Sequence, residues 1–382
     1  MERVRERTML QMVDLKSQYA KIKTEIDTAI LDVVSSTMYI GGAEVKGFQQ
    51  NLEKYLGAKH VIPCANGTDA LQIAMMALGL KAGDEVIVPS FTYVATAEVI
   101  ALLGLKPVMT DVDPKTFNIT AAIIKKHITK RTKAIVPVHL FGQSADIEAI
   151  MQLAAEHNLY VIEDNAQAIG ADYTFANGEK KKTGTIGHIG CTSFFPSKNL
   201  GCYGDGGAIS TNDDELAARI RMIANHGQSV RYYHDEIGVN SRLDAIQAAI
   251  LNVKLPRLDE YNTARNKAAK YYDKAFSKIK ELKTPFRAKN STHAFHQYTL
   301  LVKNGKRNEL NQFLEKQGVP SMIYYPVPLY KQKAFAHYWK RKSGFKTTEI
   351  LCNEVISLPM HTEHNEETLK KITDAVVAFF QK

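Results

Sequence analysis

The sequence predicts an α/β protein with two domains, a large one built on a mainly parallel sheet and a smaller α+β domain after it. Between residues 61 and 211, short β-rich runs alternate with segments of helical periodicity, which is typical of a parallel sheet covered by helices. The 382 residues, 45% of them hydrophobic and 23% charged, are enough for one large and one small core. A long helical pattern is interrupted at Pro256, so we expect domains over 1–255 and 256–382.

The large domain is predicted to begin with two helices, over 18–36 and 44–56, separated by Gly41 and Gly42. The run that ends at Cys64 is the first predicted strand. Further strands are expected over 85–89, 107–109, 133–138, 159–163 and 208–211. Helices are expected over 69–78, 95–103, 119–127, 145–157, 213–224 and 243–254. The small domain is predicted to contain a helix to about residue 279, a strand over 297–302, and helices over 308–317 and 366–380.

Composition excludes several classes of protein. No apolar run approaches the roughly 20 residues of a membrane helix, and the charged start of the chain lacks the apolar core of a signal peptide, so we expect a cytoplasmic protein without a membrane partner. The four cysteines have no paired spacing, which argues against a disulfide framework and a metal site. The formal charge of +9 is spread along the chain and suits an anionic small substrate. No nucleic-acid-binding signature is present, so we expect no nucleic-acid partner.

The stretch from Thr192 to Gly207 is the strongest candidate for a catalytic site. Its lysine, Lys198, follows two phenylalanines and a proline and precedes a cluster of glycines. Apolar surroundings lower the pKa of an amine, and an amine with a lowered pKa is a nucleophile that bonds covalently to aldehydes. The alternative is a solvated surface lysine, since Lys and Arg together number 49.

Polar residues follow predicted strands, where ligands bind in open α/β sheets. Asn66, Gly67 and Thr68 stand between a strand and a helix, and free N–H groups at a helix start bind phosphate. The alternative is that Asn66 or Thr68 only caps the helix. Asp164 ends a buried apolar strand, where a carboxylate needs a cation such as a protonated pyridine nitrogen. Its alternative is a helix cap or an ion pair within the protein.

An aromatic face for a planar ligand is offered by Tyr93 or Phe91, although a core position is the alternative for either ring. Each of these features is weak by itself. A phosphate cradle, an aromatic plate, a buried carboxylate and an apolar-flanked lysine each match a different part of one cofactor, pyridoxal 5′-phosphate (PLP). We therefore expect a PLP site.

These motifs resemble those of the DegT/DnrJ/StrS sugar-nucleotide aminotransferases. The resembling segments are Asn66-Gly-Thr-Asp-Ala70, Pro89-Ser-Phe-Thr-Tyr-Val-Ala-Thr96, Glu163-Asp-Asn-Ala-Gln167, Thr192-Ser-Phe-Phe-Pro-Ser-Lys198, Gly204-Asp-Gly-Gly207 and Gly238-Val-Asn-Ser-Arg-Leu-Asp244. The likeness runs from about Met12 to the C-terminus. It implies a PLP-dependent transferase of fold type I, the aspartate aminotransferase type, that works as a homodimer with shared active sites.

The resemblance also implies roles for individual residues. Lys198 would bind PLP covalently and move the proton, and Asp164 would pair with the ring nitrogen. Gln167 would contact the ring hydroxyl, and Tyr93 would stack on the ring. Contacts to the phosphate are implied for Gly67, Thr68, Ser193 and, from the other subunit, Asn240.

Within this family, the segments over 65–72, 194–207 and 226–228 most resemble the branch that aminates UDP-2-acetamido-2-deoxy-3-oxo-D-glucuronate with L-glutamate. The resemblance implies two half-reactions, with pyridoxamine 5′-phosphate between them, and a 3-amino sugar for a surface polysaccharide such as the O-antigen of lipopolysaccharide. Arg242 would bind a substrate carboxylate or, alternatively, pair with Asp244 at the dimer interface.

His226, Tyr324 and Tyr325 complete the implied substrate site. The branch often carries His-Tyr before Pro-x-Pro-Leu, whereas this chain has Tyr324 and Tyr325, which leaves the exact sugar open. One rival function is amination of another sugar nucleotide, at carbon 4 or on a dTDP- or GDP-linked deoxysugar. The other is a non-catalytic PLP-binding regulator, for whose usual DNA-binding domain the segment before Met12 is too short.

Overall fold

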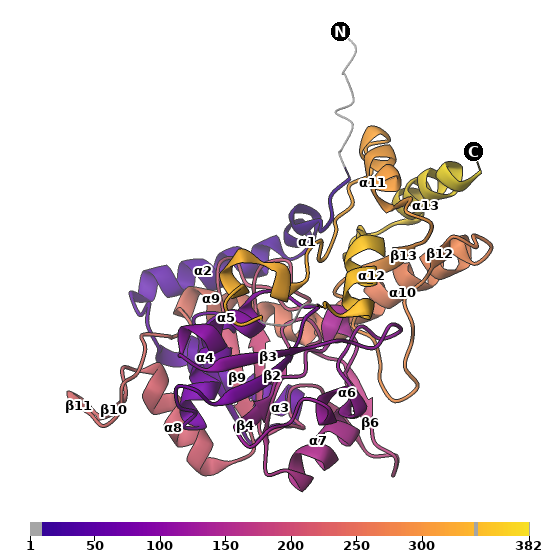
Figure 1. Ribbon diagram of the computed structural model, residues 1–382. Coiled ribbons are helices and arrows are strands. Elements are labelled where there is room, and N and C mark those ends of the chain that lie inside the picture. Colours follow the sequence, from indigo (N-terminus) through magenta and orange to yellow (C-terminus); the bar gives the residue numbers. More distant parts are fainter. Residues whose placement is uncertain (1–9, 340–342, 382) are drawn as a thin grey trace.

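The computed structural model describes residues 10–339 and 343–381. Figure 1 shows a sheet with its covering helices and, beside it, a smaller group of helices and strands that includes the C-terminus. Within the described residues, seven strands form the large sheet in the order β1-β9-β8-β5-β4-β2-β3. Their bounds are His60–Cys64 (β1), Glu85–Pro89 (β2), Lys106–Thr110 (β3), Thr132–Ile135 (β4), Tyr160–Asp164 (β5), Ile189–Ser193 (β8) and Gly207–Thr211 (β9). The predicted α/β class is confirmed.

The sheet is parallel except at one edge. The neighbours β8, β5, β4, β2 and β3 run parallel to one another. At the edge, β9 runs antiparallel to both β8 and β1. The carboxyl ends of the five parallel strands therefore meet along one side of the sheet, where ligands bind in open α/β proteins.

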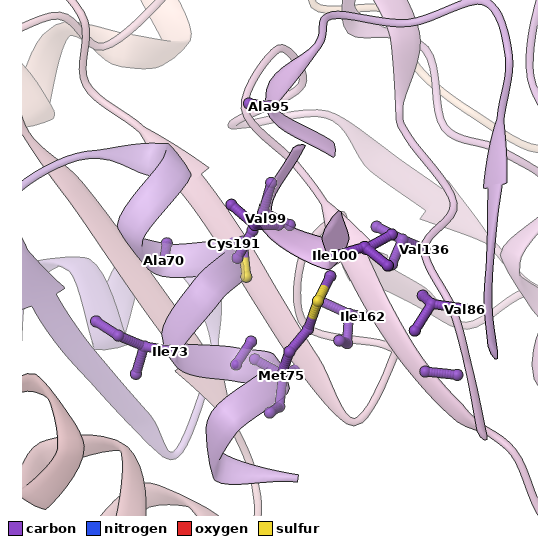
Figure 2. Packing of buried hydrophobic residues seen from close by; sticks show 14 of the residues in the cluster. Ala70, Ile73, Met75, Val86, Ala95, Val99, Ile100, Val136, Ile162 and Cys191 are labelled. Carbon is purple, nitrogen blue, oxygen red and sulfur yellow. The ribbon is translucent and has the colours of Figure 1, made fainter. Parts of the chain in front are cut away.

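Alternate residues of the central strands pack on opposite faces of the sheet. Val86 and Val88 of β2 and Ile162 of β5 belong to the core shown in Figure 2. Ile87 and Val161, from the same two strands, belong to the core on the other face. Strands covered on both faces are apolar throughout, which is why their sequences are continuous hydrophobic runs. The covering helices are α4 (Gly67–Ala77), α5 (Ala95–Leu102) and α8 (Asp214–Ala224) on the first face, and α6 (Ala121–Lys125) and α7 (Ile147–Glu156) on the second.

The single helix expected over 18–36 is two helices in the structure. They are α1 (Leu15–Lys21) and α2 (Lys23–Ser36), and α3 (Gly42–Leu56) follows. The break falls at Ile22, whose backbone is not helical (φ −122°, ψ 20°). The Ile22 side chain packs with Ile26 and Ile250, the latter on α9 (Ala245–Lys254), so burial against α9 accompanies the change in direction.

The smaller part contains, in the described residues, three antiparallel strands in the order β12-β13-β14. Its elements are α10 (Leu258–Phe276), β12 (Leu282–Lys283), β13 (Tyr298–Val302), α11 (Arg307–Lys316), α12 (Lys346–Glu354), β14 (Val355–Leu358) and α13 (Glu366–Phe380). α9 leads through a short 3-10 turn, η2 (Leu255–Arg257), directly into α10. Two 3-10 turns, η3 (Leu329–Lys331) and η4 (Lys333–Phe335), pack Leu329, Tyr330 and Phe335 into the core of the large sheet. The domain boundary at Pro256 remains a prediction.

Two short hairpins and one turn complete the fold. The hairpins are β6 (Asp172–Thr174) with β7 (Lys180–Lys182), and β10 (Gln228–Val230) with β11 (Tyr233–His234). A 3-10 turn, η1 (Leu140–Gly142), follows β4. Figure 1 shows the β10–β11 hairpin projecting from the body of the molecule beyond α8. None of the helices in the described ranges has the length and hydropathy needed to span a membrane.

Candidate active site

A cavity of about 760 Å³ opens at the carboxyl ends of the parallel strands. Residues that follow β1, β2, β4, β5 and β8 line it, because these strands end on the same side of the sheet. The expected site residues among its lining are Gly67, Thr68, Tyr93, Asp164, Gln167, Ser193, Lys198, Tyr324 and Tyr325. The structure thus gathers most of the residues proposed from the sequence into one space.

Lys198 lies in the loop between β8 and β9 and lines the cavity. The loop is closed by a hydrogen bond from the Phe194 N–H to the Gly206 carbonyl (2.8 Å), and a tight turn places the Lys198 N–H on the Phe195 carbonyl (2.8 Å). Removal from water lowers the pKa of the Lys198 amine to about 8, although the charge of Asp164 opposes this shift. A substantial share of this amine is therefore uncharged and nucleophilic at mildly alkaline pH.

Asp164 is buried at the end of β5 and faces the same cavity. Burial raises the pKa of its carboxyl, against hydrogen bonds from the Thr96 hydroxyl (Oγ1–Oδ2 2.8 Å) and the Ala166 N–H (3.2 Å) and against the charge of Lys198. The net rise shows that these groups do not fully balance a negative charge at this depth. The carboxylate therefore suits one further cationic donor, such as a protonated ring nitrogen.

The start of α4 forms a polar concave wall. The Asn66 side chain accepts a hydrogen bond from the Asp69 N–H (2.8 Å), so Asn66 does cap the helix. Gly67 and Thr68 supply the other amides of this first turn, which have no acceptor within the helix because of their position. A Cβ at Gly67 would lie 2.7 Å from the Cβ of Ser193, so only glycine lets β8 approach so closely. The capping role and the phosphate site are therefore compatible.

The structure distinguishes between the two aromatic candidates that follow β2. Tyr93 is 57% exposed and lines the cavity. Phe91 is buried and packs edge to face against Phe117, with a ring centroid distance of 6.1 Å. Tyr93 is consequently the ring available to a planar ligand, and Phe91 is a core residue.

Gln167 and Tyr325 are held by specific hydrogen bonds. Oε1 of Gln167 accepts from the Phe141 N–H (2.7 Å), and its Nε2 donates to the Tyr325 hydroxyl (3.1 Å). The backbone bond thus fixes which way the Gln167 amide faces. Burial raises the pKa of both Tyr324 and Tyr325, so both phenols are protonated donors at neutral pH.

Three expected site residues lie outside the cavity. Asn240, Arg242 and His226 are exposed and are not among its lining residues. In the part of the chain that the structure describes, Arg242 forms no ion pair, with Asp244 or any other residue. A single chain therefore does not bring these three residues to Lys198.

The sequence motifs assign no role to several residues in and around the cavity. Thr96 lies in one of these motifs and is not among the described residues that line the cavity, but its hydroxyl donates to Asp164, a bond that becomes apparent only from the fold. His296, Gln297 and Asp205 line the cavity from segments distant in sequence from the motifs after β1, β2 and β5. Nδ1 of His296 has no hydrogen-bond partner among the described residues, and burial lowers its pKa well below the usual value, so its imidazole is neutral.

These residues fit PLP part by part: an amine for the aldehyde, a carboxylate for the ring nitrogen, and a helix start for the phosphate. When bound, PLP supplies an electron sink that stabilises the charge left when a substrate carbon loses its proton. The fold and the site together define a PLP-dependent aminotransferase of fold type I.

More narrowly, the chain belongs to the DegT/DnrJ/EryC1/StrS aminotransferase family, whose model matches residues 20–377. It is 48% identical to UDP-2-acetamido-2-deoxy-3-oxo-D-glucuronate aminotransferase of Pseudomonas aeruginosa, over 96% of this chain and 99% of that protein. It is 46% identical to a pleiotropic regulatory protein of Geobacillus stearothermophilus, over 97% of this chain and 98% of that protein.

The fold is shared with solved relatives. The crystal structure of Streptomyces venezuelae DesV in complex with a ketimine intermediate superposes with a TM-score of 0.93 and 35% identity. The match covers 98% of this chain and 99% of that one. The expected family, fold type, enzyme class and cofactor are confirmed.

Proposed function

We propose that this protein transfers the amino group of L-glutamate to a keto-sugar nucleotide, UDP-2-acetamido-2-deoxy-3-oxo-D-glucuronate, to form a 3-amino sugar. The observation that carries the substrate is the 48% identity, over nearly the whole of both chains, to the Pseudomonas aeruginosa enzyme of that name. The cavity is compatible with it, because its described residues combine a nucleophilic amine with protonated phenols that can donate to sugar oxygens.

Each residue of the cavity has a task in this proposal. Lys198 holds the cofactor and, once released, carries a proton to and from the substrate carbon, for which a pKa of about 8 is suited. Asp164 keeps the ring nitrogen protonated, and Tyr93 stacks on the ring. The phosphate is contacted by Gly67, Thr68 and Ser193. The ring hydroxyl is contacted by Gln167.

The protein is proposed to work as a homodimer whose cavities are shared. Among the residues that line the cavity, Tyr93 is 57% and Phe195 53% exposed, and clustered exposed apolar surface is typical of protein interfaces. Further exposed apolar residues at the end of α2 and just beyond it are Leu31, Val34, Met38, Tyr39 and Ile40. A second copy that covered these surfaces would bury them and could deliver Asn240 to the phosphate.

Charge supports a contribution from a second chain. Among the described residues that line the cavity, Lys198 is the only lysine or arginine, whereas Asp69, Asp164 and Asp205 are acidic. L-Glutamate carries two carboxylates and the proposed sugar a third, in addition to its diphosphate. We propose that Arg242 of a second copy binds the carboxylate of the sugar, because its guanidinium is exposed and forms no ion pair in the described structure.

A panel of keto-sugar nucleotides tests the substrate. Purified protein with PLP would be given L-glutamate and one keto-sugar nucleotide at a time. The panel contains the UDP-linked 3-oxo-uronate, its neutral counterpart with a 6-hydroxymethyl group, and dTDP- and GDP-linked 4-keto-deoxysugars. We expect the highest kcat/KM for the uronate. Arg242→Lys should reduce kcat/KM for the uronate and leave that for the neutral counterpart nearly unchanged. Equal or better turnover of a deoxysugar would replace the proposed substrate.

A regulatory role is favoured by one observation, the 46% identity to the pleiotropic regulatory protein of Geobacillus stearothermophilus. A regulator without catalysis would bind PLP yet leave it in the same chemical form when glutamate is added. The absorbance spectrum of the PLP-loaded protein before and after addition of L-glutamate therefore separates the two functions. We expect glutamate to convert the visible band to that of pyridoxamine phosphate.

A further inference from the structure

A buried pair of titratable side chains lies directly behind the proposed cofactor site and contributes nothing to its lining. Nε2 of His139 lies 2.7 Å from Oε2 of Glu163, and both side chains are fully inaccessible to solvent. Glu163 is the residue before Asp164 on β5, and His139 follows β4 in the chain. Neither is among the described residues that line the cavity, so a direct contact with substrate is not their task.

The hydrogen bonds fix the protonation of this pair. Nδ1 of His139 accepts the Ala145 N–H (3.1 Å), so the proton of the imidazole is on Nε2 and is donated to Glu163. Burial alone would raise the pKa of Glu163, but the bond from His139 and the backbone N–H groups of Gly187 and Gly184 outweigh it, and the pKa is lowered. Glu163 is therefore an ionised carboxylate to which the His139 imidazole donates from Nε2.

Every oxygen of Glu163 is used. Oε1 accepts from the N–H groups of Ile186 (2.7 Å) and Gly187 (2.6 Å), and Oε2 accepts from His139 and from the Gly184 N–H (2.9 Å). Four donors on one buried carboxylate leave it a single orientation. Because neighbouring side chains of a strand point to opposite faces, a fixed Glu163 also fixes the direction in which Asp164 points.

His139 connects this carboxylate to the backbone of Asp164 and to Gln167. The backbone N–H of His139 donates to the Asp164 carbonyl (3.0 Å), and the backbone N–H of Asp164 donates to the Pro137 carbonyl (2.9 Å). Two residues further on, the Phe141 N–H holds Oε1 of Gln167 (2.7 Å). His139 thus stands at the start of the turn that sets the Gln167 amide and beside the strand end that sets the Asp164 carboxylate.

We propose that His139 and Glu163 are positioning residues that hold Asp164 and Gln167 in the orientation needed to bind the ring nitrogen and ring hydroxyl of PLP. The proposal rests on the roles given to Asp164 and Gln167 in the proposed function. It assigns the Glu163–His139 bond to the cofactor site, whereas a purely structural bond would stabilise the fold without changing the state of the ring.

The chain offers a matched control for Glu163. Glu85 is another buried carboxylate of the same sheet, bonded to the Thr129 hydroxyl (2.6 Å) and to Arg131 (Nη2–Oε1 2.8 Å). Glu85 starts β2, whereas Glu163 lies near the carboxyl end of β5, which runs parallel to β2 with β4 between them. Glu85 therefore lies at the end of the sheet away from the cavity. Glu85→Gln should lower thermal stability, as Glu163→Gln should, without an effect on the cofactor.

The experiment measures the protonation of the cofactor directly. Wild type, Glu163→Gln, Glu85→Gln and Asp164→Asn would be loaded with PLP that carries ¹⁵N in its ring, and the ¹⁵N chemical shift and the dissociation constant for PLP would be recorded. We expect a protonated ring nitrogen in wild type and Glu85→Gln. In Glu163→Gln the ¹⁵N shift should move toward the unprotonated value, with PLP binding weakened about 10-fold or more, by analogy with the loss of partners that orient metal ligands.

A second pair of variants applies if Glu163→Gln does not fold. His139→Asn keeps an acceptor for the Ala145 N–H but loses the donor to Glu163, and His139→Gln keeps that donor. His139→Gln should therefore resemble wild type more closely than His139→Asn in both ¹⁵N shift and PLP affinity. Identical behaviour of these two variants, or of Glu163→Gln and Glu85→Gln, overturns the proposal. A ring nitrogen that stays protonated in Asp164→Asn would instead refute the role of Asp164 in the proposed function.

Discussion

Two buried lysines of this protein have the same lowered pKa and different surroundings. Burial lowers the pKa of Lys198 and of Lys254 to about 8 in each case. Lys254, on α9, donates a hydrogen bond to the Gly201 carbonyl (2.5 Å) and lies 5.2 Å from the centre of the Tyr203 ring. Lys198 lines a cavity of about 760 Å³ opposite Asp164. A lowered pKa alone therefore does not identify a catalytic lysine; the free space in front of the amine does.

Both lysines belong to the same region of the fold, because Gly201 lies in the loop that carries Lys198. Lys254 bonds to the backbone of this loop from behind, and Lys198 leaves the loop toward the cavity. The comparison assigns chemistry to one amine and support of the loop to the other. Four variants, in order of decreasing effect on turnover, test this assignment.

The largest effect is expected for Lys198→Ala. Loss of the amine removes both the covalent link to PLP and the group that moves the proton, so kcat should fall by at least about 10³-fold. The visible absorbance of the Lys198-bound cofactor should be absent while the fold, followed by circular dichroism, is kept. A Lys198→Ala protein that transaminates at the wild-type rate would reassign the chemistry to another group.

The next largest effect is expected for Asp164→Asn, which keeps the shape of the side chain and removes its charge. An uncharged partner does not hold the ring nitrogen protonated, so kcat should fall on the order of 10²-fold or more. Rates would be measured at saturating PLP, so that weaker cofactor binding does not mimic the effect. Full activity of Asp164→Asn would show that the buried carboxylate is structural.

A smaller effect is expected for Thr96→Val, which removes the hydroxyl that donates to Asp164. A hydrogen bond to a charged group contributes about 1.5–3 kcal/mol, so its loss should raise the pKa of Asp164 further and reduce kcat about 10-fold. The acidic limb of the pH–rate profile should move to higher pH, because the Asp164 carboxylate becomes protonated at a higher pH. Thr96→Ser, which keeps the hydroxyl, is the control and should retain the wild-type profile.

The smallest effect on turnover is expected for Lys254→Met, which should keep a kcat within a few-fold of wild type because its amine does not reach the cavity. Its effect should appear in stability. Between about pH 8 and the ordinary lysine value of 10.5, the unfolded chain binds the Lys254 proton and the folded chain does not. Wild type should therefore gain roughly 3 kcal/mol of unfolding free energy relative to Lys254→Met over this range, as measured by urea unfolding at each pH. If the difference in unfolding free energy between wild type and Lys254→Met did not change with pH, burial would not lower the pKa of Lys254.

Much of the site could be predicted from the sequence because its residues stand immediately after apolar strand runs. Asp164 after β5 and Gly67 after β1 are examples, since the position of a strand end is readable locally. Residue type alone does not decide between Tyr93 and Phe91, because both rings follow β2; the family resemblance favours Tyr93, and the packing of the two rings separates them. The bond between Thr96 and Asp164 is not predictable locally either, because Thr96 lies on α5 after β2 and meets Asp164 only when β2 and β5 belong to one sheet.

The elements that were missed lack a local signature. β8 begins amid glycines, at Gly187 and Gly190, and a glycine-interrupted run does not score as a strand. In the sheet, however, Gly190 is required, because a Cβ there would lie 1.9 Å from the Gly184 carbonyl oxygen. β14 (Val355–Leu358) follows α12 directly, so no turn residue separates the strand from the helix before it. In both places tertiary packing, and not local preference, decides the structure.

The position of Asn240 outside the cavity has a genetic consequence if the proposed dimer is correct. A copy with Lys198→Ala and a copy with Asn240→Ala would each be inactive by themselves, yet each mixed pair would contain one cavity with both residues intact. Co-expression of the two defective alleles should therefore restore part of the activity that neither allele supports. A double variant carrying both substitutions on one chain should rescue nothing when it is paired with either.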